Sequence, residues 1–171
     1  DSVSNKLTIE GIYSDNIIYI SNGLNNASFL KNRLRTISYK TADGDTLQYK
    51  NNRFIHCKVT NGFSGPRYSS SKSLSFSNCY LKNINHNYSS PIFTNCIIHY
   101  DGNKYTSNGQ EYYFTISNLG QGTFYNCIII GVTNRGAEMN VFPTNSILYN
   151  CIATNLYSSS LTSNTSPDRD N

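Results

Sequence analysis

The chain has 171 residues, of which 37% are hydrophobic and only 14% are charged, with 14 Lys and Arg against 10 Asp and Glu. That length suits one domain, and the low charge excludes a highly charged disordered chain. Uncharged polar residues fill the gap, with 25 Asn, 23 Ser and 14 Thr. Because Asn and Ser favour turns over helix interiors, this composition excludes a mostly helical protein. The basic residues are scattered, which argues against a nucleic-acid partner, and no apolar run approaches the length of a membrane span.

One short pattern returns along the chain: a large apolar residue, a variable residue, Asn, Cys, a variable residue and an aliphatic residue. Two looser copies come first, Tyr13–Ile20 and Phe29–Thr36, in which Asn16 and Asn32 take the Cys position. Five closer copies follow, each with a cysteine in the same place: Phe54–Asn61, Phe76–Asn83, Phe93–Tyr100, Phe124–Gly131 and Leu148–Asn155.

Each copy predicts two short strands that meet at a corner. The aromatic, Cys and aliphatic positions alternate with variable ones, as inward-facing strand residues do, and Asn between them tolerates a left-handed turn. A unit this small buries its apolar side only by stacking on the next. We therefore expect an all-β fold: a right-handed parallel β-helix of about seven coils, with internal Phe and Cys stacks and an Asn corner ladder. Residues 1–157 would form this single domain, and residues 158–171 a Ser/Thr/Asn-rich tail.

The five cysteines form no close CxxC pair. Equivalent positions in a solenoid are spread along its axis, whereas a metal site needs ligands that converge. We therefore expect reduced, buried thiols and assign neither metal nor cofactor.

The outward positions one and three residues after each cysteine change along the chain. Early copies show Lys58, Thr60, Tyr80 and Lys82, whereas later ones show mainly isoleucine. Aligned on adjacent coils, these isoleucines would expose an apolar patch of the kind that a partner covers. We expect an interface at Ile97, Ile128, Ile130 and Ile152. The open candidates for the partner are another subunit, as in a trimer, a missing domain, or the chain's own segment Leu156–Leu161.

Two stretches between copies are candidate ligand-binding loops. The stretch Gly62–Tyr68 contains Arg67 and Tyr68. The insertion Tyr100–Tyr113 contains hairpin-type turns and Tyr105, Tyr112 and Tyr113, which predicts a projecting arm. Tyr, Asn and Arg on a rigid scaffold suit recognition of sugars or proteins, so a polysaccharide or cell-surface glycan is the expected ligand.

No catalytic residue can be assigned from the sequence. His56 falls on a corner, His86 on a turn and His99 on an outward position, and the last two lack a nearby Ser/Asp signature. Asp43 and Asp45 flank Gly44, which is typical of a tight turn. A carboxylate pair for glycoside hydrolysis could still be assembled from either of them with Asp101 or Glu111.

The repeat resembles the right-handed parallel β-helix, or pectin-lyase-like, superfamily. The resemblance lies in the corner positions Asn78, Asn95, Asn126 and Asn150, with Asp15, Lys31 and His56 as substitutes, and in the Phe and Cys rows. It implies a secreted or virion surface protein, located outside the cell, at the cell surface or on a virion. Within that group we expect a non-catalytic adhesin-like or tailspike-like domain that binds glycans or partner subunits. The alternative is a polysaccharide lyase or glycoside hydrolase. Complete members usually have more coils, so we expect a fragment or the distal end of a larger chain.

Overall fold

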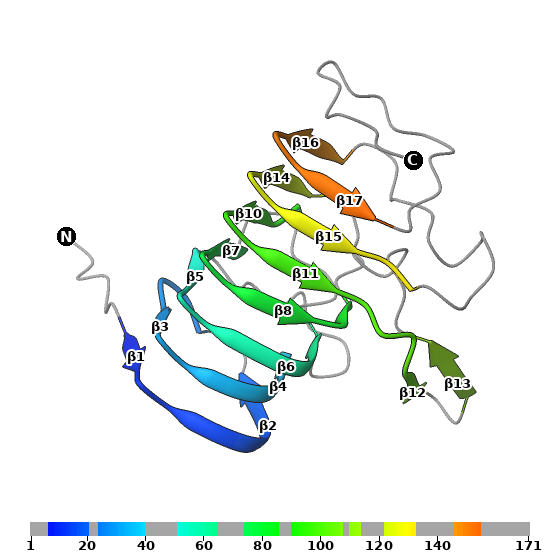
Figure 1. Ribbon diagram of the computed structural model, residues 1–171. Coiled ribbons are helices and arrows are strands. Elements are labelled where there is room, and N and C mark those ends of the chain that lie inside the picture. Colours follow the sequence, from blue (N-terminus) through cyan, green and yellow to red (C-terminus); the bar gives the residue numbers. More distant parts are fainter. Residues whose placement is uncertain are drawn as a thin grey trace.

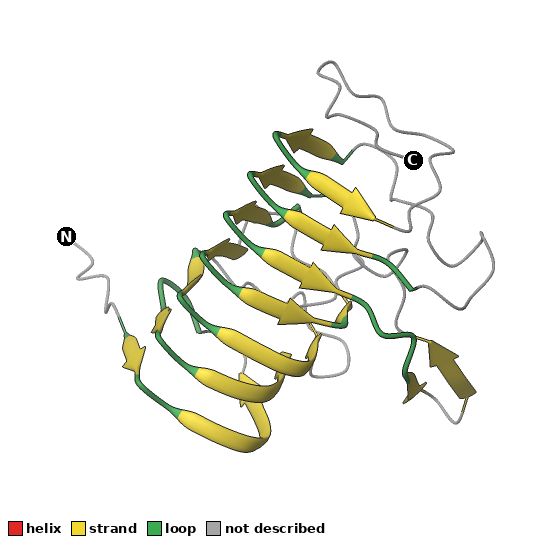
Figure 2. Ribbon diagram, in the orientation of Figure 1, coloured by secondary structure: helices red, strands yellow, loops and turns green. Residues whose placement is uncertain are grey.

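A computed structural model describes residues 7–20, 24–39, 51–64, 74–85, 90–107, 110–113, 122–132 and 146–154. Across these ranges the secondary structure is entirely β (Figure 2). Two parallel sheets stack their strands in chain order, so the chain winds as a β-solenoid (Figure 1). The predicted parallel β-helix is therefore confirmed as an architecture.

The first sheet has seven strands, and the second has eight. The first contains β1 (Thr8–Glu10), β3 (Ser28–Leu30), β5 (Asn52–Ile55), β7 (Leu74–Ser77), β10 (Ile92–Thr94), β14 (Thr123–Tyr125) and β16 (Ile147–Tyr149). The second contains β2 (Tyr13–Ile20), β4 (Arg33–Tyr39), β6 (Lys58–Ser64), β8 (Tyr80–Lys82), β11 (Ile97–His99), β15 (Ile128–Ile130) and β17 (Ile152–Thr154), with β9 (Ile84–Asn85) paired to β6.

The strands pair in register, so equivalent positions of the repeat lie one above another. Phe93 pairs with Phe76 on one side and with Phe124 on the other. In the second sheet, Ile98 pairs in the same way with Leu81 and Ile129. A one-residue slip would turn every one of these side chains outward, so the apolar rows themselves fix the register.

The core contains the predicted aromatic stack of Phe29, Phe54, Phe76, Phe93 and Phe124, all of which are buried. Neighbouring ring centroids are 4.5 to 5.1 Å apart, with planes within 16° of parallel. Phe63, at the far end of β6, meets Phe54 and Phe76 edge-on, at 5.4 and 5.1 Å. Phe63 of the second sheet thus packs against the aromatic stack of the first sheet.

The corner between the sheets is built from residues in the left-handed region. We call it the corner row: Gly11, Lys31, His56, Asn78, Asn95, Asn126 and Asn150. The six non-glycine members have φ values between 49° and 54°. Their side-chain amides form a ladder, since Asn95 Nδ2 donates to Asn78 Oδ1 at 3.3 Å and Asn126 Nδ2 to Asn95 Oδ1 at 3.2 Å. The ladder ends with Asn150 Nδ2 donating to Asn126 Oδ1 at 2.8 Å.

The first coil lies four residues upstream of the predicted copy. Gly11 occupies its corner with φ 71°, and its N–H donates to Leu30 O as the other corner residues donate to the next coil. Ile12 therefore takes the Cys position that the sequence assigned to Asn16, and Asp15 is not a corner residue. The motif does not locate this coil, because the coil has Ile9 in place of the phenylalanine and glycine in place of the corner Asn.

Behind the corner lies the thiol row: Cys57, Cys79, Cys96, Cys127 and Cys151. All five are buried and free, as predicted. Asn32 takes the equivalent position one coil earlier, and it is also buried. Its Oδ1 accepts from Ile12 N–H at 2.7 Å and its Nδ2 donates to Ile9 O at 3.0 Å. The amide thus bonds to the backbone groups that the later thiols contact, which explains why Asn and Cys exchange at this position.

The insertion after β11 forms the predicted hairpin. Strands β12 (Lys104–Ser107) and β13 (Gln110–Tyr113) pair antiparallel in a separate two-stranded sheet. Figure 1 shows this hairpin beside the stack, beyond the end of β11. The register sets Tyr105 opposite Tyr112 and Tyr113 opposite Lys104.

Several sequence predictions lie outside the described residues. They concern Arg67, Tyr68, His86, Asp43, Asp45, the segment Leu156–Leu161 and the tail 158–171.

Candidate functional site

On the outer side of the second sheet, the exposed side chains change in type from the early coils to the late ones. Its central line of side chains, directly after the thiol row, is the outer row: Tyr13, Arg33, Lys58, Tyr80, Ile97, Ile128 and Ile152. Strand register places these seven residues on consecutive coils. The row therefore passes from aromatic and cationic residues on the early coils to isoleucine on the late ones.

On the early coils, each cation of the outer row lies against a tyrosine. The Arg33 guanidinium carbon is 5.2 Å from the centroid of the Tyr13 ring. Lys58 Nζ is 5.5 Å from the centroid of the Tyr80 ring. Both distances suit a cation–π contact, so these charges are matched by neighbours within the sheet.

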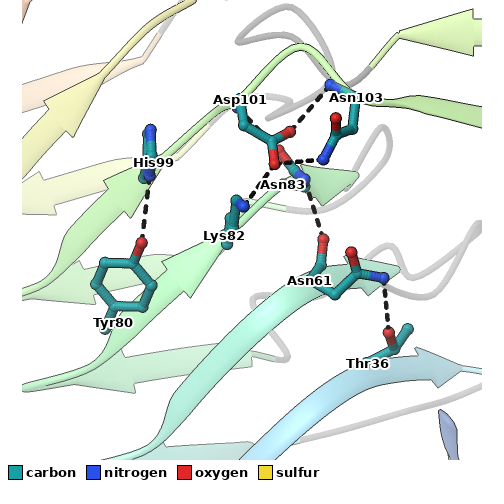
Figure 3. A network of polar contacts seen from close by, with 8 residues as sticks. All are labelled: Thr36, Asn61, Tyr80, Lys82, Asn83, His99, Asp101 and Asn103. Carbon is teal, nitrogen blue, oxygen red and sulfur yellow. Dashed lines mark hydrogen bonds and ion pairs between the residues drawn. The ribbon is translucent and has the colours of Figure 1, made fainter. Parts of the chain in front are cut away.

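A polar network joins β8 to the segment that follows β11 (Figure 3). Lys82 Nζ forms an ion pair with Asp101 Oδ2 at 2.6 Å. Asn103 donates to the same carboxylate twice, from its backbone N–H to Oδ1 at 2.9 Å and from Nδ2 to Oδ2 at 2.6 Å. Beneath them, buried Asn83 accepts from Asp101 N–H at 3.2 Å and donates to Asn61 O at 3.0 Å.

These contacts determine the charge state of Asp101. Burial favours the neutral acid, but hydrogen bonds from Lys82, Asn103 and Asn83 outweigh it and lower the pKa of the carboxyl below its ordinary value of 3.8. Both carboxylate oxygens are already bound to donors of the same chain. Asp101 is therefore a structural anion, held in place and neutralised by Lys82.

Two further polar contacts lie next to this network. The Tyr80 hydroxyl is 3.2 Å from Nδ1 of His99, and Asn61 Nδ2 donates to Thr36 Oγ1 at 3.3 Å (Figure 3). His99 thus faces a tyrosine on the neighbouring strand, not a carboxylate or a nucleophile. Over the part of the chain that the structure describes, no group of three or more His, Cys, Asp or Glu side chains is placed to hold a metal ion.

The late coils expose apolar side chains at the predicted interface residues. Ile97 and Ile128 are each 39% exposed, and Ile152 is 62% exposed. Ile130 lies in the adjacent line and is half-buried between His99 and Thr154. The structure therefore brings all four together on neighbouring strands.

The same end of the stack exposes aromatic residues on the other side of the corner. Tyr125 and Tyr149 stack with ring centroids 4.9 Å apart and planes within 4°, and both rings are exposed. The corner amides lie between the tyrosines and the isoleucines. We call this surface the apolar face: Tyr125, Tyr149, Ile97, Ile128 and Ile152, with Asn95, Asn126 and Asn150 between them. None of these eight residues carries a charge.

Sequence reasoning found the isoleucines but missed the tyrosines. Tyr125 and Tyr149 each follow an inward-facing residue and precede a corner Asn. Period-two alternation of strand side chains therefore places both outward, and that signal was available in the sequence.

The predicted ligand-binding tyrosines belong to a different place. Tyr105, Tyr112 and Tyr113 lie on the hairpin strands β12 and β13, away from the corner row in the chain's topology. Their role in ligand binding stays a prediction.

The chain matches no model of a known protein family, and it is not significantly similar to any curated protein or solved structure. Among the described residues there is no helix that is long and apolar enough to cross a membrane.

Proposed function

We propose that this chain is a non-catalytic β-helix module that associates with other copies of itself through the apolar face. One observation carries the proposal: three isoleucines on consecutive coils and a stacked tyrosine pair are exposed together, with no charged residue among them. Contiguous exposed apolar surface on a soluble protein is normally covered. Aromatic enrichment and depletion of charge are also typical of interface cores.

The contrast with the early coils supports this assignment. There the same outer row carries Arg33 and Lys58, each matched by a tyrosine. Among the described residues of the outer row, the charged side chains thus lie on the early coils and the isoleucines on the late ones. A single patch that meets its own equivalent on another copy needs no second surface, and such an isologous interface closes as a two-fold dimer.

Glycan binding at this face is less well supported. Sugars pack on the flat faces of aromatic rings, and Tyr125 and Tyr149 already turn faces toward each other. The hairpin tyrosines remain the better candidates for a glycan. A location at the cell surface, outside the cell or on a virion, and membership of the right-handed pectin-lyase-like superfamily, rest on the repeat's resemblance to that group.

The enzymatic alternative, a polysaccharide lyase or glycoside hydrolase, needs charged groups that converge on a substrate. Among the described residues, Asp101 and Lys82 come nearest to this requirement, and they neutralise each other.

The double variant Ile128→Lys, Ile152→Lys tests the proposal by placing two cations in the interface. We expect the wild-type chain to sediment as an oligomer with a melting temperature that rises with protein concentration, and the variant as a monomer whose melting temperature does not depend on concentration. Tyr13→Lys is the matched control, because Tyr13 is an exposed member of the same outer row on the first coil, and it should leave the oligomer intact. A variant with unchanged mass, or a wild-type chain that is already a monomer and is destabilised by the two lysines, would show the proposal to be wrong.

A further inference from the structure

The thiol row is a line of sulfur atoms with no assigned role. Its five cysteines are 1 to 4% exposed and form no disulfide. The residue after each cysteine pairs in register with its counterpart on the next coil. Consecutive cysteines therefore lie one strand spacing apart, about 4.8 Å in a parallel sheet.

The five sulfur atoms also take the same orientation along the row. Each Sγ lies 3.2 to 3.4 Å from the carbonyl oxygen two residues before it, from Cys57 with Ile55 to Cys151 with Tyr149. Further weak contacts join neighbouring coils, such as Cys79 Sγ to Phe54 O at 3.4 Å and Cys127 N–H to Cys151 Sγ at 3.4 Å. Equivalent sulfurs on consecutive coils therefore lie one above another, one strand spacing apart.

That spacing fits one kind of metal coordination. A thiolate–metal bond is about 2.3 Å long for zinc, so an ion midway between two sulfurs needs them about 4.6 Å apart. Zinc itself prefers four converging ligands, and the described residues contain no such group. Cu(I) and Ag(I) are soft ions that select sulfur ligands and accept two of them in a line. We propose that adjacent thiols of this row bind soft monovalent ions of the Cu(I) class, one ion between two consecutive coils.

Binding requires the loss of one proton and no change in oxidation state. One thiol loses its proton to solvent and forms a sulfur–metal bond, while its neighbour coordinates as a neutral thiol. The product has no net charge, as a buried site requires.

Two variants keep three thiols each, on consecutive coils in one and on alternate coils in the other. Comparing them shows whether silver binding depends on neighbouring thiols or only on the number of thiols. Cys57→Ala, Cys151→Ala keeps the three consecutive thiols, whereas Cys79→Ala, Cys127→Ala keeps three thiols with an alanine between each. Ag(I) serves as the probe, because it shares the charge and softness of Cu(I) without its redox chemistry. After incubation and removal of free ion, native mass spectrometry of the folded chain should show two silver ions on the wild type, one on the consecutive variant and none on the alternate variant.

Equal silver binding by the two variants, or none by the folded wild type, would overturn the proposal. Silver X-ray absorption on the wild type needs no variant to fold. We expect two sulfur neighbours around each ion, and a first shell of oxygen, nitrogen or three or more sulfurs would contradict a two-coordinate site between coils.

Discussion

At the scale of single residues, the corner row combines a left-handed backbone turn with a side-chain hydrogen bond between coils. Every coil must turn through the left-handed region at this point, which costs most residues roughly 1–2 kcal/mol. Asparagine lowers that cost by its conformational tolerance and adds an amide that bonds to the next coil. Lys31 and His56 adopt the same φ, which shows that the stacked coils impose the turn even where the residue is unfavourable.

Asn126 separates these two contributions. Asn126→Gly removes the amide and leaves the turn relaxed, so we expect it to lower the free energy of unfolding by about 0.5 kcal/mol, since the ladder is exposed to water. Asn126→Ala removes the same amide and also strains the backbone. The strain should lower the free energy of unfolding by about a further 1–2 kcal/mol. Chemical denaturation of both variants measures the difference. Equal stabilities would mean that the left-handed turn contributes nothing.

Asn32 is a buried amide that the neighbouring coils would replace by a thiol. Asn32→Ala removes the side-chain acceptor of Ile12 N–H and one donor to Ile9 O, and we expect a loss of about 1–3 kcal/mol. Asn32→Cys restores a weak donor and acceptor of the kind used at Cys57, so it should recover part of that loss. If the two variants are equally stable in urea titrations, the amide's bonds to the backbone do not stabilise the first coils.

At the scale of structural elements, the stacked rings hold consecutive strands of the first sheet together. Phe93 is fully buried, with ring centroids of Phe76 and Phe124 at 4.9 and 4.8 Å. Phe93→Ala should lower the free energy of unfolding by about 3–5 kcal/mol through lost burial and a cavity. Phe93→Leu fills much of that space and should cost less. A loss below about 1 kcal/mol for the alanine variant, measured by denaturation, would be inconsistent with a central ring.

The ion pair between Lys82 and Asp101 joins β8 to the segment after β11, and its effect on stability depends on pH. The folded-state pKa of Asp101 lies below the ordinary value of 3.8, so the pair stabilises the protein fully above that value and is lost as pH falls through the lower one. Lys82→Met removes the pair. We expect the variant to be less stable than the wild type at neutral pH, and the difference to shrink toward zero by about pH 2.

Thermal unfolding of both proteins across this range checks the effect. Lys82→Arg is the control, because it keeps a cation opposite Asp101 and should preserve the acid dependence. A stability difference that stays constant from neutral to acidic pH would mean that Asp101 does not sense Lys82.

At the scale of the whole molecule, the sequence predicted the solenoid because the same constraint recurs on each coil. Five cysteines in one position fixed the register of the later coils, and the Phe and aliphatic rows follow from it. The first coil was misplaced because Gly11 and Ile12 satisfy the same geometry without resembling the motif. The turn and the inward position tolerate several residue types, so a pattern of letters alone does not locate them.

The candidate surfaces were predictable to different degrees. The isoleucines followed from strand alternation on aligned coils, and the tyrosine pair follows from the same rule. The network around Asp101 did not, because it depends on a segment after β11 folding back over Lys82 and Asn83, residues 18 or more positions earlier. Contacts of that kind depend on the path of one loop and leave no periodic signal in the chain.

Across the described residues, the outer row thus differs between its two ends, with cations that contact tyrosines on the early coils and the isoleucines of the apolar face on the late ones. Association through that face is the central claim, and the mass of the unmodified chain in solution tests it most directly. Sedimentation velocity over a concentration series should give species at a small multiple of 19.2 kDa that dissociate on dilution. A chain that sediments as a 19.2 kDa monomer at every concentration would contradict the account.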